Sequence, residues 1–163
     1  MYLKFRAVTR YLVLSLLILG MQPAYCQSSD VIANHFNALA QHDVKAIANG
    51  YADDAQVFSP NWEGAKTGPA GISEVYTRYF SSSPDLTYKV LNTINAGSTI
   101  VVEYTTSGTL SNPESGTPDY MKGKKYTLTY CAIFTIKNGK IAKKTDYFDQ
   151  VAFLRQVGFF DQH

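Results

Sequence analysis

The sequence has few of the residues and motifs that hold cofactors. It contains two cysteines and three histidines in 163 residues, and neither type recurs at a spacing typical of a metal site. It also has no glycine-rich loop of the kind that binds phosphate groups. We therefore predict that the protein uses no metal and no organic cofactor.

A concentrated positive charge is also missing. The largest basic cluster is Lys122, Lys124 and Lys125, which lies in a predicted turn and is readily explained as a solvated loop. Binding to nucleic acid requires a clustered positive surface that can contact several phosphates. The sequence therefore predicts no nucleic-acid partner.

The only long apolar run lies near the N-terminus and is too short to span a bilayer comfortably. It covers residues 11–21 and follows the basic residues Lys4, Arg6 and Arg10. Ala24-Tyr25-Cys26 comes next, with small residues at the positions that a signal peptidase recognises. We predict that residues 1–26 are a signal peptide, that residues 27–163 form one exported domain in the periplasm or outside the cell, and that this domain has no membrane span.

Two alternatives concern the cysteines. Cys26 lies at a suitable depth for lipidation, but the bulky Tyr25 fits poorly before a lipidated cysteine, so a lipoprotein is the less favoured interpretation. If Cys26 leaves with the leader, Cys131 is the only cysteine and no intramolecular disulfide can form. We expect Cys131 to be a small buried apolar residue rather than a nucleophile.

Loss of the leader also changes the charge. Without Lys4, Arg6 and Arg10, twelve basic residues face thirteen acidic ones, so the net charge becomes about −1 instead of +2. The basic character of the whole chain therefore comes from the predicted leader. The remaining length suits a single domain with a core of its own.

The first half of this domain has helical periodicity. Apolar residues between Val31 and Leu39 predict a helix that ends near His42, and Asp43 is a suitable cap for a second helix through residues 47–51. Residues 55–59 are predicted to form a short extended segment. Pro69 fits the first turn of a third helix.

The second half of the domain is predicted to form strands. Residues 86–96, 99–110, 124–137 and 140–148 are rich in Val, Ile, Thr and Tyr, and Asn138-Gly139 is a strong hairpin signal. A short amphipathic helix follows. Helices first and strands afterwards predict an α+β fold in which three helices cover one face of a curved antiparallel sheet and enclose an apolar pocket.

Six segments in order along the chain carry a family resemblance. They are HFNALAQHDV (35–44), YADDA (51–55), GPAGI (68–72), FSSSPDL (80–86), VVEYT (101–105) and DYFD (146–149) with the LRQVG that follows. Together they resemble the SnoaL-like branch of the nuclear transport factor 2-like superfamily, which also contains ketosteroid isomerase. The resemblance implies a cone-shaped barrel with an apolar pocket, and a dimer formed through the outer face of the sheet. Functions within the superfamily range from polyketide cyclases and isomerases to binding proteins without chemistry.

Asp146 is the main catalytic candidate. Alternation along a strand puts Lys144, Asp146 and Phe148 on one face. By position, Asp146 resembles the acid/base carboxylate of SnoaL-type cyclases, and burial among aromatic side chains would disfavour its charged form and suit it to proton transfer. The alternative is that Asp146 is simply paired with Lys144.

The resemblance also implies a role for His35 and a set of pocket residues. His35 lies on the apolar face of the first helix, where relatives have a polar pocket group, and could hold or protonate a carbonyl oxygen. The alternative is an ordinary core histidine. The residues expected to line the pocket are Phe58, Trp62, Tyr76, Tyr126, Tyr130, Phe134 and Phe148.

The machinery of ketosteroid isomerase is missing from this sequence. Ser59 stands where that enzyme has its general base, and Ala132 stands where it has a hydrogen-bonding acid. A serine cannot accept a carbon-bound proton at neutral pH, and alanine offers no donor. Steroid isomerisation by that route is therefore not expected.

Two functional hypotheses remain. The first is a cofactor-free lyase or isomerase that resembles the polyketide cyclases and acts through Asp146 on a small hydrophobic carbonyl compound. The second is a module of the same fold that binds a ligand or a protein without turnover. Whether Asp146 faces an enclosed cavity, and whether it is paired, separates them.

Overall fold

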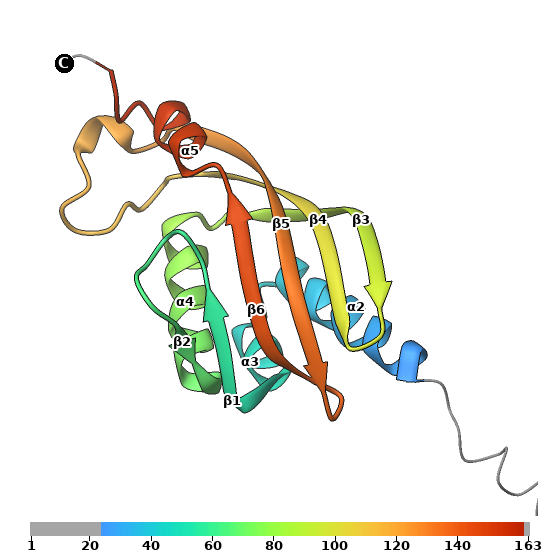
Figure 1. The fold of residues 1–163 in the computed structure, drawn as a ribbon. Coiled ribbons are helices and arrows are strands. Elements are labelled where there is room, and N and C mark those ends of the chain that lie inside the picture. Colours follow the sequence, from blue (N-terminus) through green and yellow to red (C-terminus); the bar gives the residue numbers. More distant parts are fainter. Residues whose placement is uncertain (1–23, 162–163) are drawn as a thin grey trace, which may run out of the picture.

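The computed structural model describes residues 24–161 (Figure 1). The predicted signal peptide, residues 1–26, lies almost wholly outside the described residues and stays a prediction. No helix within residues 24–161 combines the length and the apolar character needed to cross a membrane.

Three helices make up most of the first half of the fold. They are α2 (Ala24–Ala40), α3 (Val44–Asn49) and α4 (Gly68–Ser82). The side chain of Asp43 accepts a hydrogen bond from the backbone N–H of Ala46 at 2.9 Å, so it caps α3 as predicted. Pro69 lies in the first turn of α4, where a missing N–H costs nothing.

Six strands form one curved sheet in the order β2-β1-β6-β5-β4-β3. The four long strands predicted in the second half are present within two residues of the expected bounds. Tyr51 opens β1 instead of closing the second helix, and the two-residue β2 was not predicted. The strands are β1 (Tyr51–Phe58), β2 (Lys66–Thr67), β3 (Thr87–Ala96), β4 (Thr99–Thr109), β5 (Lys125–Lys137) and β6 (Lys140–Phe148).

The sheet is mixed rather than purely antiparallel. Strand β1 runs parallel to β6, whereas the other neighbouring pairs are antiparallel. The β5–β6 hairpin turns at Asn138 and Gly139, whose φ angles of 53° and 71° are those of the tight turn that this residue pair favours. The register shifts in the β1–β6, β3–β4 and β5–β6 pairs, and such irregularities bend a sheet.

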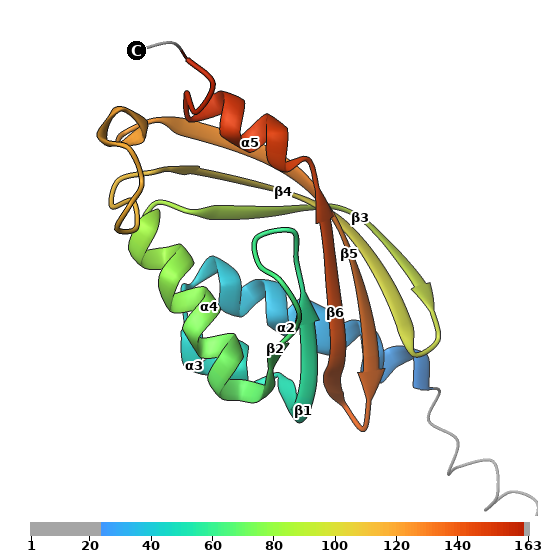
Figure 2. The ribbon, with the colours of Figure 1, turned by 60° about the vertical axis from the view of Figure 1, so that its left-hand side comes forward.

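The three helices lie on the concave side of this sheet, as Figures 1 and 2 show. The core forms between the two layers, and α4 buries Ile72, Val75 and Tyr76 there. A short helix, α5 (Gln150–Gln156), and the 3-10 turn η1 (Asp119–Met121) lie at the far end of the sheet. The predicted cone-shaped α+β fold is confirmed.

The expected burial of Cys131 is wrong. Alternation along β5 turns Ala132 inward, where it is fully buried, and turns Cys131 outward, where it is exposed. Cys131 therefore belongs to the convex outer face of the sheet and not to the core.

Candidate functional site

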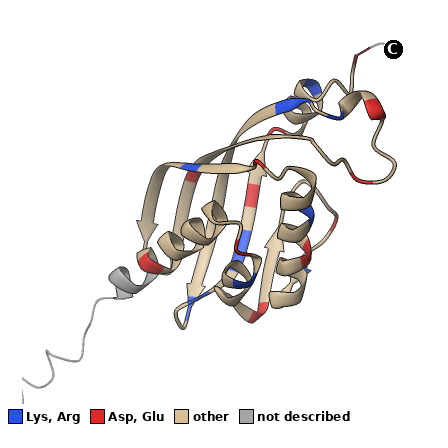
Figure 3. Cartoon of the chain, turned by 180° about the vertical axis from the view of Figure 1, so that it is seen from behind, with Lys and Arg blue, Asp and Glu red and all other residues tan. Residues whose placement is uncertain are grey.

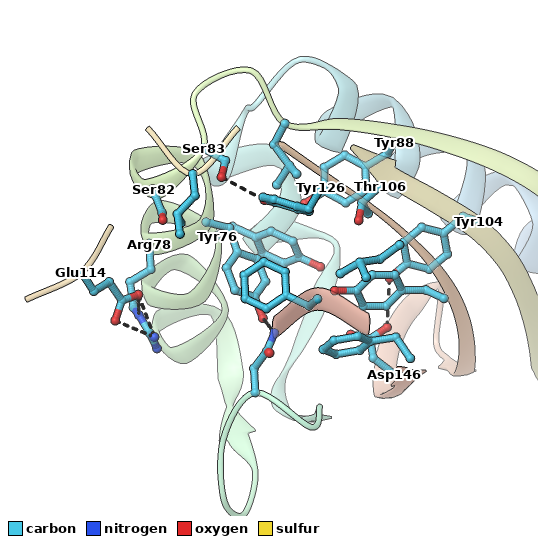
Figure 4. A pocket seen from close by; sticks show the side chains of 18 of the residues that line it. Tyr76, Arg78, Ser82, Ser83, Tyr88, Tyr104, Thr106, Glu114, Tyr126 and Asp146 are labelled. Carbon is cyan, nitrogen blue, oxygen red and sulfur yellow. Dashed lines mark hydrogen bonds and ion pairs between the residues drawn. The ribbon is translucent and has the colours of Figure 1, made fainter. Parts of the chain in front are cut away.

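A cavity of about 260 Å³ lies between the concave face of the sheet, α4 and the segment that follows β4. Figure 4 shows it from close by: Arg78 and Glu114 lie at one end of the lining, and Asp146 and Tyr104 at the other. The aromatic lining residues are Tyr76, Tyr79, Tyr88, Tyr104, Tyr126, Tyr130, Phe148 and Phe153.

One wall is a stack of aromatic rings across three strands. Tyr104 on β4 is the direct cross-strand neighbour of Tyr130 on β5, which is in turn the neighbour of Phe148 on β6. The ring centroids of Tyr104 and Tyr130 are 5.1 Å apart, and those of Tyr130 and Phe148 are 4.4 Å apart. The strand register thus produces an ordered flat apolar wall.

A buried ion pair interrupts this apolar lining. The Nζ atom of Lys144 lies 2.8 Å from Oδ2 of Asp146, and the two side chains are only 5% and 8% exposed. Both come from β6 two residues apart, so they share a face of the strand as predicted. Asp146 therefore faces the cavity and is paired with Lys144, which combines features of both hypotheses.

Two tyrosine hydroxyls extend the ion pair into a chain of hydrogen bonds. Tyr104 donates to Oδ1 of Asp146 at 3.1 Å, and Nζ of Lys144 donates to the hydroxyl of Tyr76 at 3.2 Å. The chain joins β4, β6 and α4. Partners of this kind are needed because an uncompensated buried charge is very costly.

The ion pair keeps Lys144 charged. Burial lowers the pKa of an ammonium group, but the adjacent Asp146 carboxylate and the Tyr76 hydroxyl outweigh it, so the pKa of Lys144 lies above its ordinary value. At neutral pH the site therefore contains an ammonium group held by a carboxylate and has no net charge from this pair.

The buried tyrosines that line the cavity remain hydrogen-bond donors. Burial, and then the nearby charge of Asp146, raises the pKa of Tyr104 well above its usual value, and burial also raises the pKa of Tyr79 and of Tyr130. Their hydroxyls therefore stay protonated throughout the physiological range. Tyr79 also accepts a hydrogen bond from Nδ2 of Asn61 at 2.7 Å.

The other end of the cavity carries a more exposed ion pair. Nε of Arg78 donates to Oε1 of Glu114 at 2.9 Å, and Nη2 donates to Oε2 at 3.1 Å. Both side chains are more than a third exposed, so solvent weakens this pair relative to the buried one. Neither residue was singled out from the sequence, because their contact joins α4 to an irregular segment.

The structure brings together five of the predicted site residues. Asp146, Tyr76, Tyr126, Tyr130 and Phe148 all line the cavity. Tyr104 also lines it but was not predicted individually, although alternation along β4 places it on the same face as the buried Val102 and Thr106.

Four other predicted residues lie outside the lining of this cavity. Phe134 is wholly buried within the core, and Trp62 packs against the core instead of lining the cavity. Phe58 is at the end of β1, where Nζ of Lys143 lies 5.2 Å from its ring centre.

His35 is the fourth. It is 3% exposed, and its ring lies edge-on to the rings of Phe36, Tyr51, Tyr76 and Phe134. Burial, and then the charge of Lys144, lowers the pKa of His35 well below its usual value, so its imidazole is neutral. The face of α2 that carries His35 is turned into the core, and His35 does not line the cavity.

The described residues offer no obvious metal site. Within residues 24–161 no three side chains of the metal-binding types gather around a common point.

Basic and acidic positions are interspersed along the elements (Figure 3).

A family model for the SnoaL-like domain matches residues 32–144. No curated protein matches the chain in sequence. Of the described elements, this match contains α2 from Ile32 onward, the helices α3 and α4, the strands β1 to β5 and the start of β6 up to Lys144.

Solved structures of the same fold cover most of the chain. IdmH, a putative polyketide cyclase from Streptomyces antibioticus, is 24% identical, with 81% of this chain and 99% of that chain covered and a TM-score of 0.68. A putative SnoaL-like polyketide cyclase from Jannaschia sp. CCS1 is 16% identical, with 83% and 94% covered and a TM-score of 0.73. TerC, co-crystallised with polyporic acid, is 23% identical, with 80% and 98% covered and a TM-score of 0.67.

Proposed function

The chain belongs to the SnoaL-like domain family, and from this premise we propose that its cavity binds a small hydrophobic carbonyl compound and catalyses a cofactor-free isomerase or lyase reaction on it. The observation that carries the proposal is the buried Lys144–Asp146 ion pair beside an aromatic wall. The fold and its relatives are compatible with either an enzyme or a ligand-binding protein.

The lining supports a ligand that is apolar along most of its length. The stacked rings of Tyr104, Tyr130 and Phe148 favour contact with a flat apolar body. The volume of about 260 Å³ lies slightly below the usual range for ligand pockets, which favours a small molecule. The polar group of such a ligand finds its partners at the Lys144–Asp146 end.

Proton transfer at that end needs only residues of this chain. The carboxylate of Asp146 takes a proton from the carbon next to the carbonyl, and the C–H electron pair forms an enolate. Once Asp146 is protonated, the hydroxyl of Tyr104 can leave it and donate its hydrogen bond to the enolate oxygen, which is the role expected of His35 from the sequence. The proton later returns from Asp146 to a different carbon of a conjugated enolate, which gives the isomer, and no oxidant or reductant is consumed. General acid–base assistance of this kind typically contributes about 10²-fold to 10⁴-fold.

The alternative is a binding protein of the same fold without turnover. The observation that favours it is that both carboxylate oxygens of Asp146 already accept hydrogen bonds. One oxygen is bonded to Lys144 and the other to Tyr104. A carboxylate held at both oxygens is well placed to orient a ligand. To act as a base it has to give up one of these bonds or use its remaining lone pairs.

Exchange of α-protons separates the two functions. The purified protein is incubated in D₂O with a panel of small enolisable aryl ketones, and loss of the α-proton signal is followed by NMR. Polyporic acid, with which TerC was co-crystallised, serves as a first binding probe. We expect exchange above the buffer rate, and we expect it to fall by about 10²-fold or more in Asp146→Asn.

The control is Asp149→Asn, which makes the same chemical change at an exposed position. Asp149 caps α5 by accepting a hydrogen bond from the N–H of Ala152, and asparagine caps a helix equally well. Exchange should be unchanged in this variant. Binding without exchange by the wild-type protein would refute the enzyme and support the binding protein.

We also propose that two copies pair through the convex face of the sheet. Ile94, Ile133 and Tyr147 on this face are 57%, 36% and 55% exposed, and Ile94 and Tyr147 line the same shallow groove. An exposed apolar surface of this kind is typical of interaction sites. A monomer in light scattering at micromolar concentration would refute the dimer.

Export is the last part of the proposal, and it rests on the sequence of residues 1–26. The basic start, the short apolar run and the small residues near Cys26 support a cleaved leader. Mass spectrometry of the protein from its native host tests this proposal: a mature chain that begins near Gln27 is expected, and an intact N-terminus would refute it.

A further inference from the structure

His35 and Tyr51 are buried polar residues that the cavity does not use. Both ring nitrogens of His35 are buried without a hydrogen-bond partner among residues 24–161, and the buried hydroxyl of Tyr51 makes no well-formed hydrogen bond there. Burial, and then the neighbouring Tyr76 hydroxyl, raises the pKa of Tyr51 well above its ordinary value. The two ring centroids are 5.6 Å apart. Native cores leave very few buried polar groups unsatisfied, because each costs about 1–3 kcal/mol.

The aromatic residues around His35 do not satisfy it, because no hydrogen bond joins either ring nitrogen to the hydroxyl of Tyr51 or Tyr76. A neutral imidazole has one N–H donor and one nitrogen acceptor. The N–H can point at the face of a neighbouring ring, which is a weak interaction. The acceptor nitrogen needs a real donor, and the rings of Phe36 and Phe134 have none.

Lys144 lies against the same rings as His35. Its Nζ atom is 5.8 Å from the ring centres of Tyr76 and Phe134, and the centroid of His35 is 6.2 Å and 5.6 Å from those rings. The hydrogen bonds of Lys144 to Asp146 and Tyr76 use two of its three N–H groups. The third N–H group of Lys144 is therefore available as a donor.

We propose that His35 and Tyr51 bind one internal water molecule behind the ion pair. The water accepts the third N–H of Lys144 and donates to the acceptor nitrogen of His35, and the Tyr51 hydroxyl is its third partner. Buried waters typically make about three hydrogen bonds. His35 is then a positioning residue, which acts on the cavity through the water and Lys144.

This inference deepens the proposed function, because it concerns the same ion pair. It also applies if the cavity only binds a ligand. Its test therefore uses stability and the NMR signal of Lys144 and does not depend on turnover.

The first test is a double-mutant cycle with His35→Phe and Tyr51→Phe, which remove polar atoms and keep most of the volume. Each single variant leaves the remaining partners unsatisfied, so each melting temperature should fall by about 3–5 °C. The double variant should fall by less than the sum of the two. If the effects of the two single changes simply add, whether they lower or raise the melting temperature, the groups share no water and the proposal is wrong.

The second test follows the side-chain ammonium of Lys144 by ¹H–¹⁵N NMR, with Lys144→Met for assignment. His35→Phe should shift this signal and speed its exchange with solvent. The control is His42→Phe, because His42 stacks on Phe80 at 4.1 Å and bonds the carbonyl of Leu86, away from Lys144. An unchanged Lys144 signal in His35→Phe would overturn the proposal.

A high-resolution crystal structure gives the direct result. Density for a water within hydrogen-bond distance of His35, Tyr51 and Lys144 would support the proposal. A direct bond between the Tyr51 hydroxyl and His35, with no water there, would overturn it.

Discussion

The two faces of the curved sheet carry side chains of the same strands but bury them to very different extents. On β6, Lys144 points to the concave face and is 4% exposed, whereas its neighbour Lys143 is exposed. Asp146 is buried in an ion pair, and the next residue, Tyr147, is 55% exposed. One strand therefore carries charges inside and an aromatic ring outside.

The contrast shows that burial, more than chemical type, determines how strongly each side chain affects the stability of the fold. A charge on the concave face is tolerated only because a partner compensates it. An apolar group on the convex face costs little in the single chain, and it is available for the proposed pairing with a second copy. The two faces should therefore respond to mutation very differently.

The largest effect is expected from Lys144→Met. It leaves the Asp146 carboxylate buried without its partner, which should lower the free energy of unfolding by about 3–5 kcal/mol. Lys143→Met makes the same change one residue earlier on the exposed face and should cost less than about 1 kcal/mol. Urea unfolding of both variants measures the difference, and equal losses would contradict the contrast between the faces.

A smaller loss is expected when both charges are removed together. Lys144→Met combined with Asp146→Leu replaces the pair by apolar side chains, and such replacements are often neutral or stabilising. The double variant should be more stable than Lys144→Met alone by at least about 2 kcal/mol in urea unfolding. If the double variant is the less stable of the two, the pair contributes more than mutual compensation.

A moderate effect is expected from pH through His35. Its pKa is lowered in the folded state, so below its ordinary value of 6.5 the unfolded chain binds a proton that the folded chain does not. Stability should therefore be lost as pH falls, by about 1.5 kcal/mol between pH 6.5 and 5. Denaturant unfolding of wild type and His35→Phe over this pH range measures the loss of stability caused by His35, which should disappear in the variant. Parallel curves would mean that His35 is not buried in its neutral form.

The smallest change in folding stability is expected on the convex face. Tyr147→Lys should alter the free energy of unfolding of the monomer by less than about 0.5 kcal/mol. It should nevertheless disrupt the proposed dimer, which light scattering measures as a halved mass. Asn49→Lys is the control, because it adds the same charge at an exposed position on the helical layer. A dimer that survives Tyr147→Lys would place the interface elsewhere.

Much of the fold was predictable because it depends on local patterns. The cap at Asp43, the turn at Asn138-Gly139 and the alternation along β6 are decided by residues a few positions apart. Strand β2 was missed because two residues show no periodicity, and the parallel β1–β6 pair was missed because it joins segments that are far apart in the chain.

The sequence by itself determined that Lys144 and Asp146 share a face and that aromatic residues alternate along the late strands, because a strand has a fixed period of two residues. Only the tertiary structure decided that Tyr104 and Tyr76 complete the chain of hydrogen bonds and that Phe134 and His35 lie outside the cavity. It also decided that Cys131 is exposed. The physical reason is that strand register and helix packing, and not the local pattern, determine which distant side chains meet and which of them reach the cavity.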